Sequence, residues 1–156
     1  MAAAFGMKVQ IWSRSLKTAP SSDVELCSSL GELAATSDVI TVHAASSGAP
    51  LLGAEFFQAV RQGAIFINTA RGSVVDEEAL LQAIDDKQLR VGVDVYAGEP
   101  SEPDAEFASP VALHTDTVAT HHVGASTSQA QDAVGAVLVE VIASFSSSGT
   151  ADTMVV

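Results

Sequence analysis

The sequence predicts an α/β fold in which a parallel sheet carries helices on both faces. Successive apolar runs start roughly 30 residues apart, the size of one βαβ unit, and segments with helical signals separate most of them. Alternation of this kind implies parallel pairing. Five runs have the length and β-branched composition of buried strands: Met7–Trp12, Asp38–His43, Ala64–Thr69, Val91–Tyr96 and Thr117–His121.

The helical segments are marked by capping residues and by apolar spacing. The chain opens on what resembles the last turn of a helix, stopped by Gly6. Ser29 and Glu32 have the spacing of a capping box, and so do Ser126 and Gln129. Helices are expected at about 1–5, 29–35, 53–61, 77–86 and 126–145. The Pro- and Glu-rich segment 97–114 is expected to be a long loop, a length that suggests a functional edge.

The stretch Gly63–Glu78, GAIFINTARGSVVDEE, organises the chain around a cation. Its apolar run ends at Asn68, and Asp76 is a good N-cap followed by acids in the first helical turn. Arg71 therefore lies just past the carboxyl end of a strand, where ligands bind in open parallel sheets. Taken alone, Arg71 could equally be a surface residue of a connecting loop.

The composition predicts one globular domain and excludes some partners. The 156 residues are 47% hydrophobic and 17% charged, enough for one domain with a core. The formal charge of −12 argues against nucleic acid or an anionic membrane surface as a partner, because both need a basic face. A small anionic substrate needs only a local cation, such as Arg14, Lys17 or Arg71.

The single cysteine and the apolar runs indicate a cytoplasmic protein. Cys27 cannot form a disulfide within the chain, and we expect it to be a small buried hydrophobe. No apolar run approaches the roughly 20 residues of a membrane span. The first residues, Met-Ala-Ala-Ala, lack the basic region of a signal peptide. We therefore expect no membrane segment.

Three strand ends carry side chains that together fit one reaction. Arg71 follows the third predicted strand, Asp94 and Glu99 the fourth, and His121 and His122 the fifth. The carboxyl ends of parallel strands meet at one edge. An Arg binds a carboxylate through two hydrogen bonds, a His exchanges a proton near neutral pH, and an acid fixes the imidazole tautomer. With a nicotinamide to take the hydride, this set fits oxidation of a 2-hydroxy acid.

Each of these residues also has a structural interpretation. Either histidine of the pair could be a hydrogen-bonded structural residue, and Glu99 an ordinary solvated acid. His43, at the end of the second strand, is expected to be structural or a backbone-level cofactor contact. His114 is expected to be a loop residue, and Phe56 and Phe57 are expected to pack in the core.

Three motifs connect the chain to a family. INTARGSVVDEEAL, GVDVYAGEP and THHVGASTSQAQ, in this order and spacing, resemble the D-isomer-specific 2-hydroxyacid dehydrogenases. Within that family, Gly124–Gln131 most resembles the D-3-phosphoglycerate dehydrogenases. The resemblance implies a Rossmann-like NAD-binding domain and an oxidoreductase acting on a small 2-hydroxy acid. It also implies a homodimer in the full-length protein.

The resemblance assigns roles position by position. Arg71 matches the substrate-binding Arg and His122 the general acid–base histidine. Glu99 matches the family's acid five residues after the aspartate at position 94. Asp94 matches the residue that contacts the nicotinamide carboxamide. The cofactor contacts expected besides Asp94 are Ser13, Arg14, His43, Thr69, Ala70, Arg71, His122, Val123, Gly124 and Ala125.

Three positions depart from the family's pattern. His121 and Ala45 each stand where the family often has Pro. Ser13, followed by Arg14, stands where an Asp usually bonds the adenine ribose. Without that acid a 2′-phosphate is not repelled, and Arg14 could bind it. We expect NAD as the cofactor and leave NADP open.

The glycine-rich phosphate loop of such domains has no counterpart here, since Gly-x-Gly-x-x-Gly does not occur. We therefore expect the sheet to lack its first strand, and the chain to be the C-terminal portion of a dehydrogenase with little activity alone. Residues 1–150 are expected to form a partial dinucleotide-binding domain, and 151–156 resemble the return to a missing substrate domain. The rival hypothesis is a non-catalytic module that binds a nucleotide or a partner.

Overall fold

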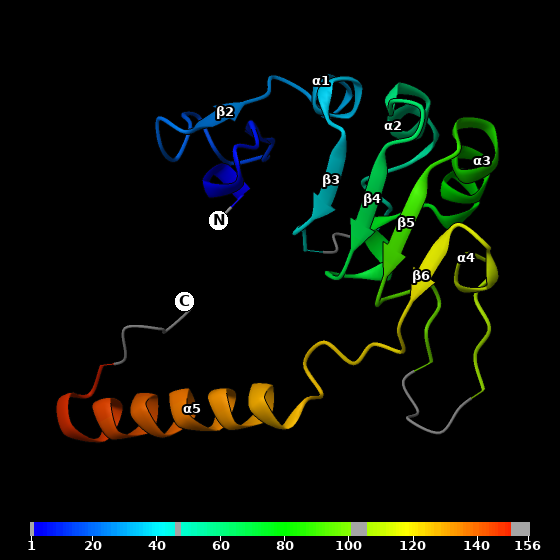
Figure 1. The fold of residues 1–156 in the computed structure, drawn as a ribbon. Helices are drawn as coiled ribbons and strands as arrows, with labels where there is room; N and C mark the ends of the chain where they lie inside the picture. The colour runs from blue at the N-terminus through cyan, green and yellow to red at the C-terminus, as the bar shows by residue number, and fades with distance from the viewer. Residues whose placement is uncertain (1, 46–47, 101–105, 151–156) are drawn as a thin grey trace. The chain divides into compact units, whose positions relative to one another are not determined.

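Parallel pairing joins the strands that the structure describes (Figure 1). The computed structural model describes residues 2–45, 48–100 and 106–150, and the chain divides into two compact units, Met1–Thr120 and His121–Val156. In the first unit β1 pairs with β2, and the other strands form a sheet in the order β3-β4-β5-β6. The predicted parallel α/β fold is confirmed, although within the described residues of this unit helices cover only one face of the larger sheet, because Val39 and Val118 on the other face are exposed. The strands are β1 (Val9–Ile11), β2 (Val24–Leu26), β3 (Val39–Val42), β4 (Ile65–Asn68), β5 (Arg90–Val93) and β6 (Thr117–Ala119).

β2 is the strand that the sequence did not predict. Each of the five predicted runs coincides with a strand that is shorter than the run, and β5 begins one residue before its run, at Arg90. β2 has only three residues and follows the polar segment 13–23, so no apolar run marks it. Pairing with β1 holds β2 in its extended form: Val24 lies opposite Val9, and the Cys27 N–H donates to the Ile11 carbonyl at 2.8 Å.

The helices of the first unit form a row in which each contacts the next from α1 to α4. On α2, Phe57 meets Phe66 of β4 edge to face, with ring centroids 5.3 Å apart. Phe56 and Phe57 are buried, as predicted. The helical elements are η1 (Ala2–Phe5), α1 (Leu30–Thr36), α2 (Ala54–Ala59), η2 (Gly72–Val74), α3 (Glu77–Lys87), α4 (Pro110–Leu113) and α5 (Ser128–Ser148).

Two predicted caps differ in detail from the structure. Ser29 accepts a hydrogen bond from the Glu32 N–H at 3.0 Å, as predicted, but the Glu32 carboxylate accepts from the Ser28 N–H rather than reaching back to Ser29. The N-cap of α5 is Thr127, which accepts from the Ala130 N–H, and not Ser126. The short helices η2 and α4 were not predicted, because three or four residues show no apolar periodicity.

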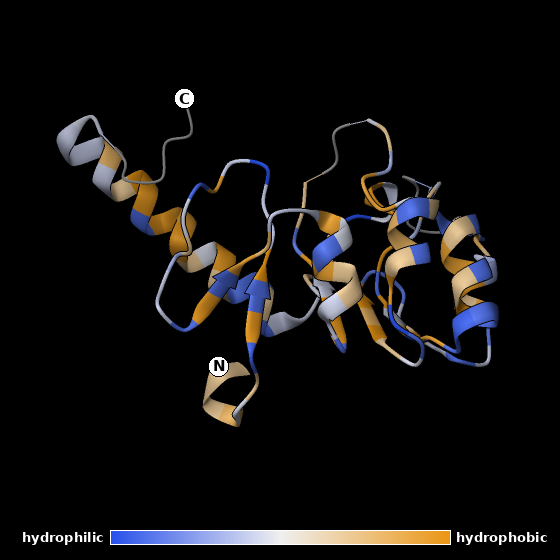
Figure 2. Ribbon diagram, turned by 90° about the horizontal axis from the view of Figure 1, so that it is seen from above, coloured by the Kyte–Doolittle hydropathy of each residue, from blue (hydrophilic) through white to orange (hydrophobic). Residues whose placement is uncertain are grey.

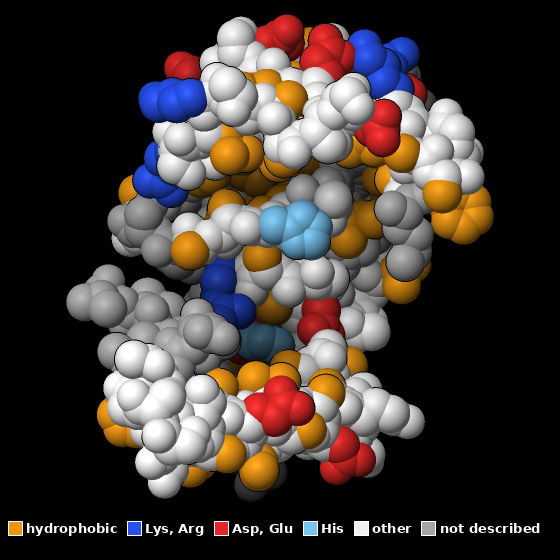
Figure 3. All heavy atoms as spheres, turned by 90° about the vertical axis from the view of Figure 1, so that its left-hand side faces the viewer, with side chains coloured by type: hydrophobic (Ala, Val, Ile, Leu, Met, Phe, Trp, Pro, Cys, Tyr) orange, Lys and Arg blue, Asp and Glu red, His pale blue; other side chains and the backbone are white. Residues whose placement is uncertain are grey.

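A cavity of about 610 Å³ separates the two sheets. Residues of β1 and β3 line its opposite sides, including Val9, Ile11, Ile40 and Val42. In the space-filling view, apolar side chains line a hollow in the upper part of the face shown (Figure 3). Within the described residues no strand bridges β1 and β3. This gap is the feature expected of a sheet that lacks one strand.

The second unit consists mainly of α5. Figure 2 shows apolar residues along its length. None of its residues is buried, and most of the large apolar side chains are more than half exposed: Val134, Val137, Leu138, Val139, Ile142 and Phe145. By length and composition α5 is apolar enough to cross a membrane, with a mean hydropathy of 1.2. No continuous apolar run in α5 reaches that length, because polar residues such as Asp132 and Glu140 interrupt it, so the expectation of no membrane segment stays a prediction. One such helix is weak evidence, since helices of soluble proteins pass the same test. Residues 151–156 lie outside the described part.

Candidate active site

The strands of the larger sheet end in one row. Val42, Asn68, Val93 and Ala119 lie opposite one another in the strand register. The residues that follow them therefore share the carboxyl edge, as predicted for a parallel sheet. They are His43, Thr69, Asp94 and Thr120. Three of these four were expected to contact the cofactor.

Asp94 is tied to the next strand at this edge. Its side chain is buried, and it accepts a hydrogen bond from the Thr120 hydroxyl at 2.5 Å. The Thr120 carbonyl accepts from the Tyr96 hydroxyl at 2.7 Å. The sequence analysis did not select Thr120, because its role depends on pairing across strands rather than on a local motif.

Arg71 is held by a buried amide. Asn68 is only 2% exposed; its Nδ2 donates to the Arg71 carbonyl at 3.0 Å, and its Oδ1 accepts from the Ala70 N–H at 3.1 Å. These bonds fix the turn, while the guanidinium itself is exposed and donates from Nη1 to the Ala70 carbonyl. The sequence analysis did not assign a role to Asn68. The signal was available, since Asn commonly folds back on its own turn.

Gly72 brings this turn against the segment after β5. A Cβ on Gly72 would lie 1.9 Å from the Tyr96 carbonyl carbon, so only glycine fits there. The backbones beside Arg71 and beside Tyr96 are thus in direct contact. Glu99 follows three residues after Tyr96, so the cation and this acid belong to neighbouring loops.

Carboxylates surround the Tyr96 phenol. Burial raises the pKa of Tyr96, and the negative charges of Asp94, Glu99 and Glu77 raise it further. Tyr96 is therefore neutral at physiological pH and serves as a hydrogen-bond donor. Glu99 therefore lies close enough to the Tyr96 phenol for its charge to act on it.

The polar end of the cavity gathers three predicted cofactor residues. Ser13 and Arg14, just after β1, and His43, just after β3, all line it together with Trp12. The Ser13 hydroxyl accepts from the Ser15 N–H, and the His43 Nε2 hydrogen-bonds the Thr41 hydroxyl at 3.1 Å. Within the described residues no glycine-rich loop supplies the backbone N–H groups that would donate to a pyrophosphate.

His122 belongs to the second unit and is described separately. It is exposed and has a φ of +54°, in the left-handed region that non-glycine residues rarely adopt. Such backbone strain concentrates at functional sites. Val123, Gly124 and Ala125 are exposed beside it. The shared rim of Arg71, Glu99 and His122 remains a prediction.

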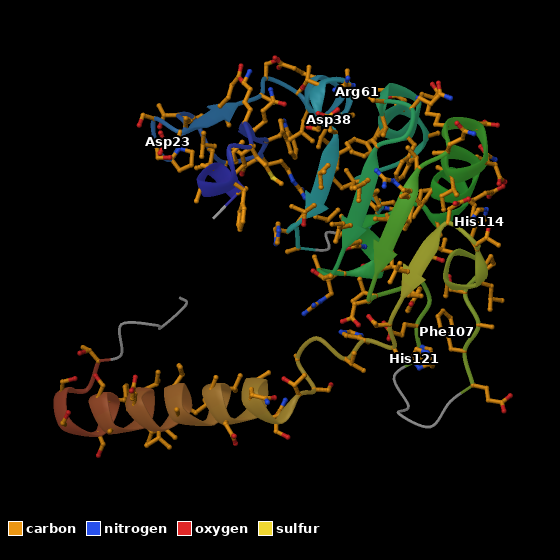
Figure 4. All side chains as sticks on the ribbon, in the orientation of Figure 1. Asp23, Asp38, Arg61, Phe107, His114 and His121 are labelled. Carbon is orange, nitrogen blue, oxygen red and sulfur yellow. The ribbon has the colours of Figure 1, made fainter. Side chains whose placement is uncertain are left out.

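The other titratable candidates have structural partners. His114 caps α4 and hydrogen-bonds Asp85 at 3.2 Å (Figure 4). Cys27 is buried, as predicted, and burial raises the pKa of its thiol, with Glu32 and Glu25 adding to the effect. Among residues 2–45, 48–100 and 106–150, no group of three or more His, Cys, Asp or Glu side chains could hold a metal ion.

Comparison with known proteins identifies the domain. Residues 1–124 match the family described as D-isomer specific 2-hydroxyacid dehydrogenase, NAD binding domain. The chain belongs to this family. The resemblance predicted from the three motifs is therefore confirmed, and a nicotinamide cofactor is confirmed at the level of the family.

Relatives of this NAD-binding domain are longer than the chain itself. A D-3-phosphoglycerate dehydrogenase from Haemophilus influenzae is 33% identical over 153 residues, which are 96% of this chain and 37% of the relative. The structure of D-2-hydroxyisocaproate dehydrogenase matches with a TM-score of 0.83 and 25% identity, covering 98% of this chain and 50% of that one. A D-isomer specific 2-hydroxyacid dehydrogenase from Xanthobacter autotrophicus Py2, solved with NADPH and MES, matches with a TM-score of 0.76 and 28% identity, covering 99% and 63%.

Proposed function

We propose that the protein containing this chain transfers a hydride between a 2-hydroxy acid and a nicotinamide cofactor. The observation that carries the proposal is the carboxyl edge of the sheet. There the exposed Arg71 is held by the buried Asn68, next to the loop that carries Glu99. An Arg presented in this way binds a carboxylate through two parallel hydrogen bonds. In this proposal His122 moves the hydroxyl proton and Glu99 supports it.

The proposed substrate is D-3-phosphoglycerate or a related 2-hydroxy acid. The name of the Haemophilus relative supports this choice, as does the resemblance of the motifs that contain Arg71, Glu99 and His122. The cofactor, when bound, takes or gives the hydride. Thr69, Ala70, Asp94 and the backbone of 122–125 are proposed to contact it, with Ser13, Arg14 and His43 at the adenosine end. We further propose a cytoplasmic homodimer.

The first test is cofactor binding by the 156-residue chain. Trp12 is the only tryptophan and lines the cavity beside Ser13 and Arg14. Its fluorescence is therefore expected to be quenched, saturably, when NADH or NADPH is added. The absence of quenching would indicate that the glycine-rich segment is required for binding, and the titration is then repeated on a fusion that supplies this segment ahead of Met1.

The second test is turnover in that fusion. Arg71→Ala and His122→Ala are each expected to abolish oxidation of D-3-phosphoglycerate, while His114→Ala, a structural histidine at the end of α4, is expected to retain it. Normal rates in either of the first two variants would end the assignment. Cofactor binding without turnover of any 2-hydroxy acid would favour the rival, a non-catalytic nucleotide-binding module.

A further inference from the structure

Glu77, the first residue of α3, joins two distant points of the chain. Its Oε1 accepts a hydrogen bond from the Ala97 N–H at 2.6 Å, and its Oε2 accepts from the Ser109 hydroxyl at 3.2 Å. Ala97 and Ser109 are the two ends of the segment 97–109. One half-buried carboxylate therefore fixes both ends of that segment.

Glu77 does not serve as the cap of its own helix. Asp76 is the N-cap of α3 and accepts from the Glu78 and Ala79 N–H groups at 3.1 Å each. Glu78, the next acid, is exposed. The helix end is thus already capped, and the carboxylate of Glu77 is directed across to the loop instead.

A carboxylate suits this position because it offers two acceptors. The Ala97 N–H and the Ser109 hydroxyl both donate to Glu77, and the Ser109 oxygen is also engaged as the acceptor of the Val111 N–H at 3.2 Å. An amide in place of the carboxylate would present a donor on one side. A Gln at 77 keeps one acceptor oxygen but loses the charge and the second acceptor, so both hydrogen bonds are weakened.

The segment that Glu77 fixes carries Glu99. Ala97 and Glu99 are separated only by Gly98, which turns the chain with a φ of +70°. On the other side of Ala97, the Tyr96 backbone rests on Gly72, and the ring of Phe107 lies 5.8 Å from the Tyr96 ring (Figure 4 labels Phe107). Fixing Ala97 therefore limits where Glu99 can lie.

We propose that Glu77 is a positioning residue that sets the place of Glu99 at the sheet edge carrying Arg71 and Asp94. The inference rests on the proposed function, in which Glu99 supports the proton transfer of His122. Glu77 touches neither substrate nor cofactor in this proposal. It acts through the backbone between Ala97 and Glu99.

The first test measures amide hydrogen exchange in the 156-residue chain at low temperature. Glu77→Ala is expected to speed exchange at Ala97 about tenfold, since a hydrogen bond to a charged acceptor is lost, and Glu77→Gln to have a smaller effect. Glu78→Gln, which removes the same charge one residue away, is expected to leave Ala97 unchanged. Exchange at Leu80 and Ile84 reports whether α3 stays folded. If Glu77→Ala unfolds α3, exchange at Ala97 in the Glu77→Gln variant is the deciding measurement. Unchanged exchange at Ala97 in a folded Glu77 variant overturns the proposal.

The second test asks whether Glu77 acts through Glu99 in the fusion used for turnover. Glu77→Gln is expected to lower kcat about tenfold, with the KM for the cofactor unchanged, and to shift the pH profile of kcat. In a Glu99→Gln background the same change is expected to have no further effect. Equal effects in both backgrounds overturn the inference alone. A wild-type fusion that turns over no 2-hydroxy acid overturns the proposed function, and this role of Glu77 with it.

Discussion

Buried polar side chains that form hydrogen bonds hold the carboxyl edge of the sheet in place. Asn68 uses both its amide oxygen and its amide nitrogen within one turn, and Asp94 accepts from Thr120 across two strands. Burying such groups is unfavourable unless they are paired, so each pairing allows one geometry. At the residue scale the candidate site is therefore fixed by buried polar groups, while Arg71, the proposed substrate-binding residue, stays exposed.

Tyr96 gives a direct measure of this edge. The pKa of Tyr96 lies above its ordinary value of 10.0, because burial and the carboxylates of Asp94, Glu99 and Glu77 disfavour the phenolate. Above about pH 10 the folded chain holds the phenol proton more tightly than the unfolded chain, so stability is expected to fall as pH rises. Tyr96 is the only tyrosine, so phenolate absorbance reports it alone. We expect a midpoint above 10.0, lowered by Glu99→Gln and unchanged by Glu55→Gln. A midpoint at or below 10.0 in the wild type would contradict the contacts described.

Arg14 is the residue expected to distinguish the two cofactors. No acid occupies position 13 to repel a 2′-phosphate, and Arg14 lines the same cavity as Ser13. Arg14→Gln is expected to weaken NADPH binding about tenfold, the loss of one charge-assisted hydrogen bond, and to leave NADH binding nearly unchanged. Trp12 fluorescence measures both. Lys17→Gln, three residues away, is the matched control. An equal loss for the two cofactors would assign Arg14 a structural role.

At the scale of elements, strands were predictable where several apolar residues follow one another. β4 and β5 have such runs, with Phe66 and Val91 buried at their centres. β2 and α4 could not be predicted, because three or four residues acquire their structure from a partner: β1 for β2, and the Ser109 cap with its Glu77 contact for α4.

The site was predictable to a similar extent. Arg71, Asp94 and Glu99 follow strand ends, so the parallel topology alone gathers them. Thr120, Ser109 and the bridging role of Glu77 were not predictable, since each depends on a hydrogen bond between elements far apart in the sequence. Sequence patterns report periodicity and turns, and they carry no information on which loop a carboxylate reaches.

The N-cap of α3 stabilises a helix that contributes buried side chains to the core. Asp76 accepts from the Glu78 and Ala79 N–H groups, and α3 buries Leu80 and Ile84 against the sheet. Asp76→Ala is expected to cost about 1 kcal/mol of unfolding free energy, because two helix N–H groups lose their acceptor. Chemical denaturation measures this cost. Asp76→Asn keeps an acceptor oxygen and is expected to restore most of the stability, whereas equal losses in both variants would exclude capping as the cause.

At the scale of the whole molecule, three apolar surfaces have no cover within the described residues. The β1 and β3 edges border the cavity between the sheets. One face of the larger sheet is half-buried at Ile65 and Ile67 and exposed at Val118, opposite the face that packs against the helices. The apolar residues of α5 form the third. The stability of these 156 residues alone therefore rests chiefly on the β3–β6 sheet and its row of helices.

This uneven packing predicts how the 156-residue chain unfolds. Unpaired strand edges and uncovered apolar surface favour association over folding as a single unit. We expect a broad thermal transition, with the amides of β1, β2 and α5 exchanging long before those of β4 and β5. Hydrogen exchange followed by strand, beside calorimetry and light scattering, measures each part. Supplying an apolar strand and its glycine-rich turn ahead of Met1 is expected to protect β1 and β3 together, because such a strand would pair with both and fill the cavity between them. A sharp, reversible melt of the purified monomer, with β1 as protected as β4, would show instead that the two sheets are stable across an open gap. The cavity would then be a binding site in its own right rather than the place of a strand.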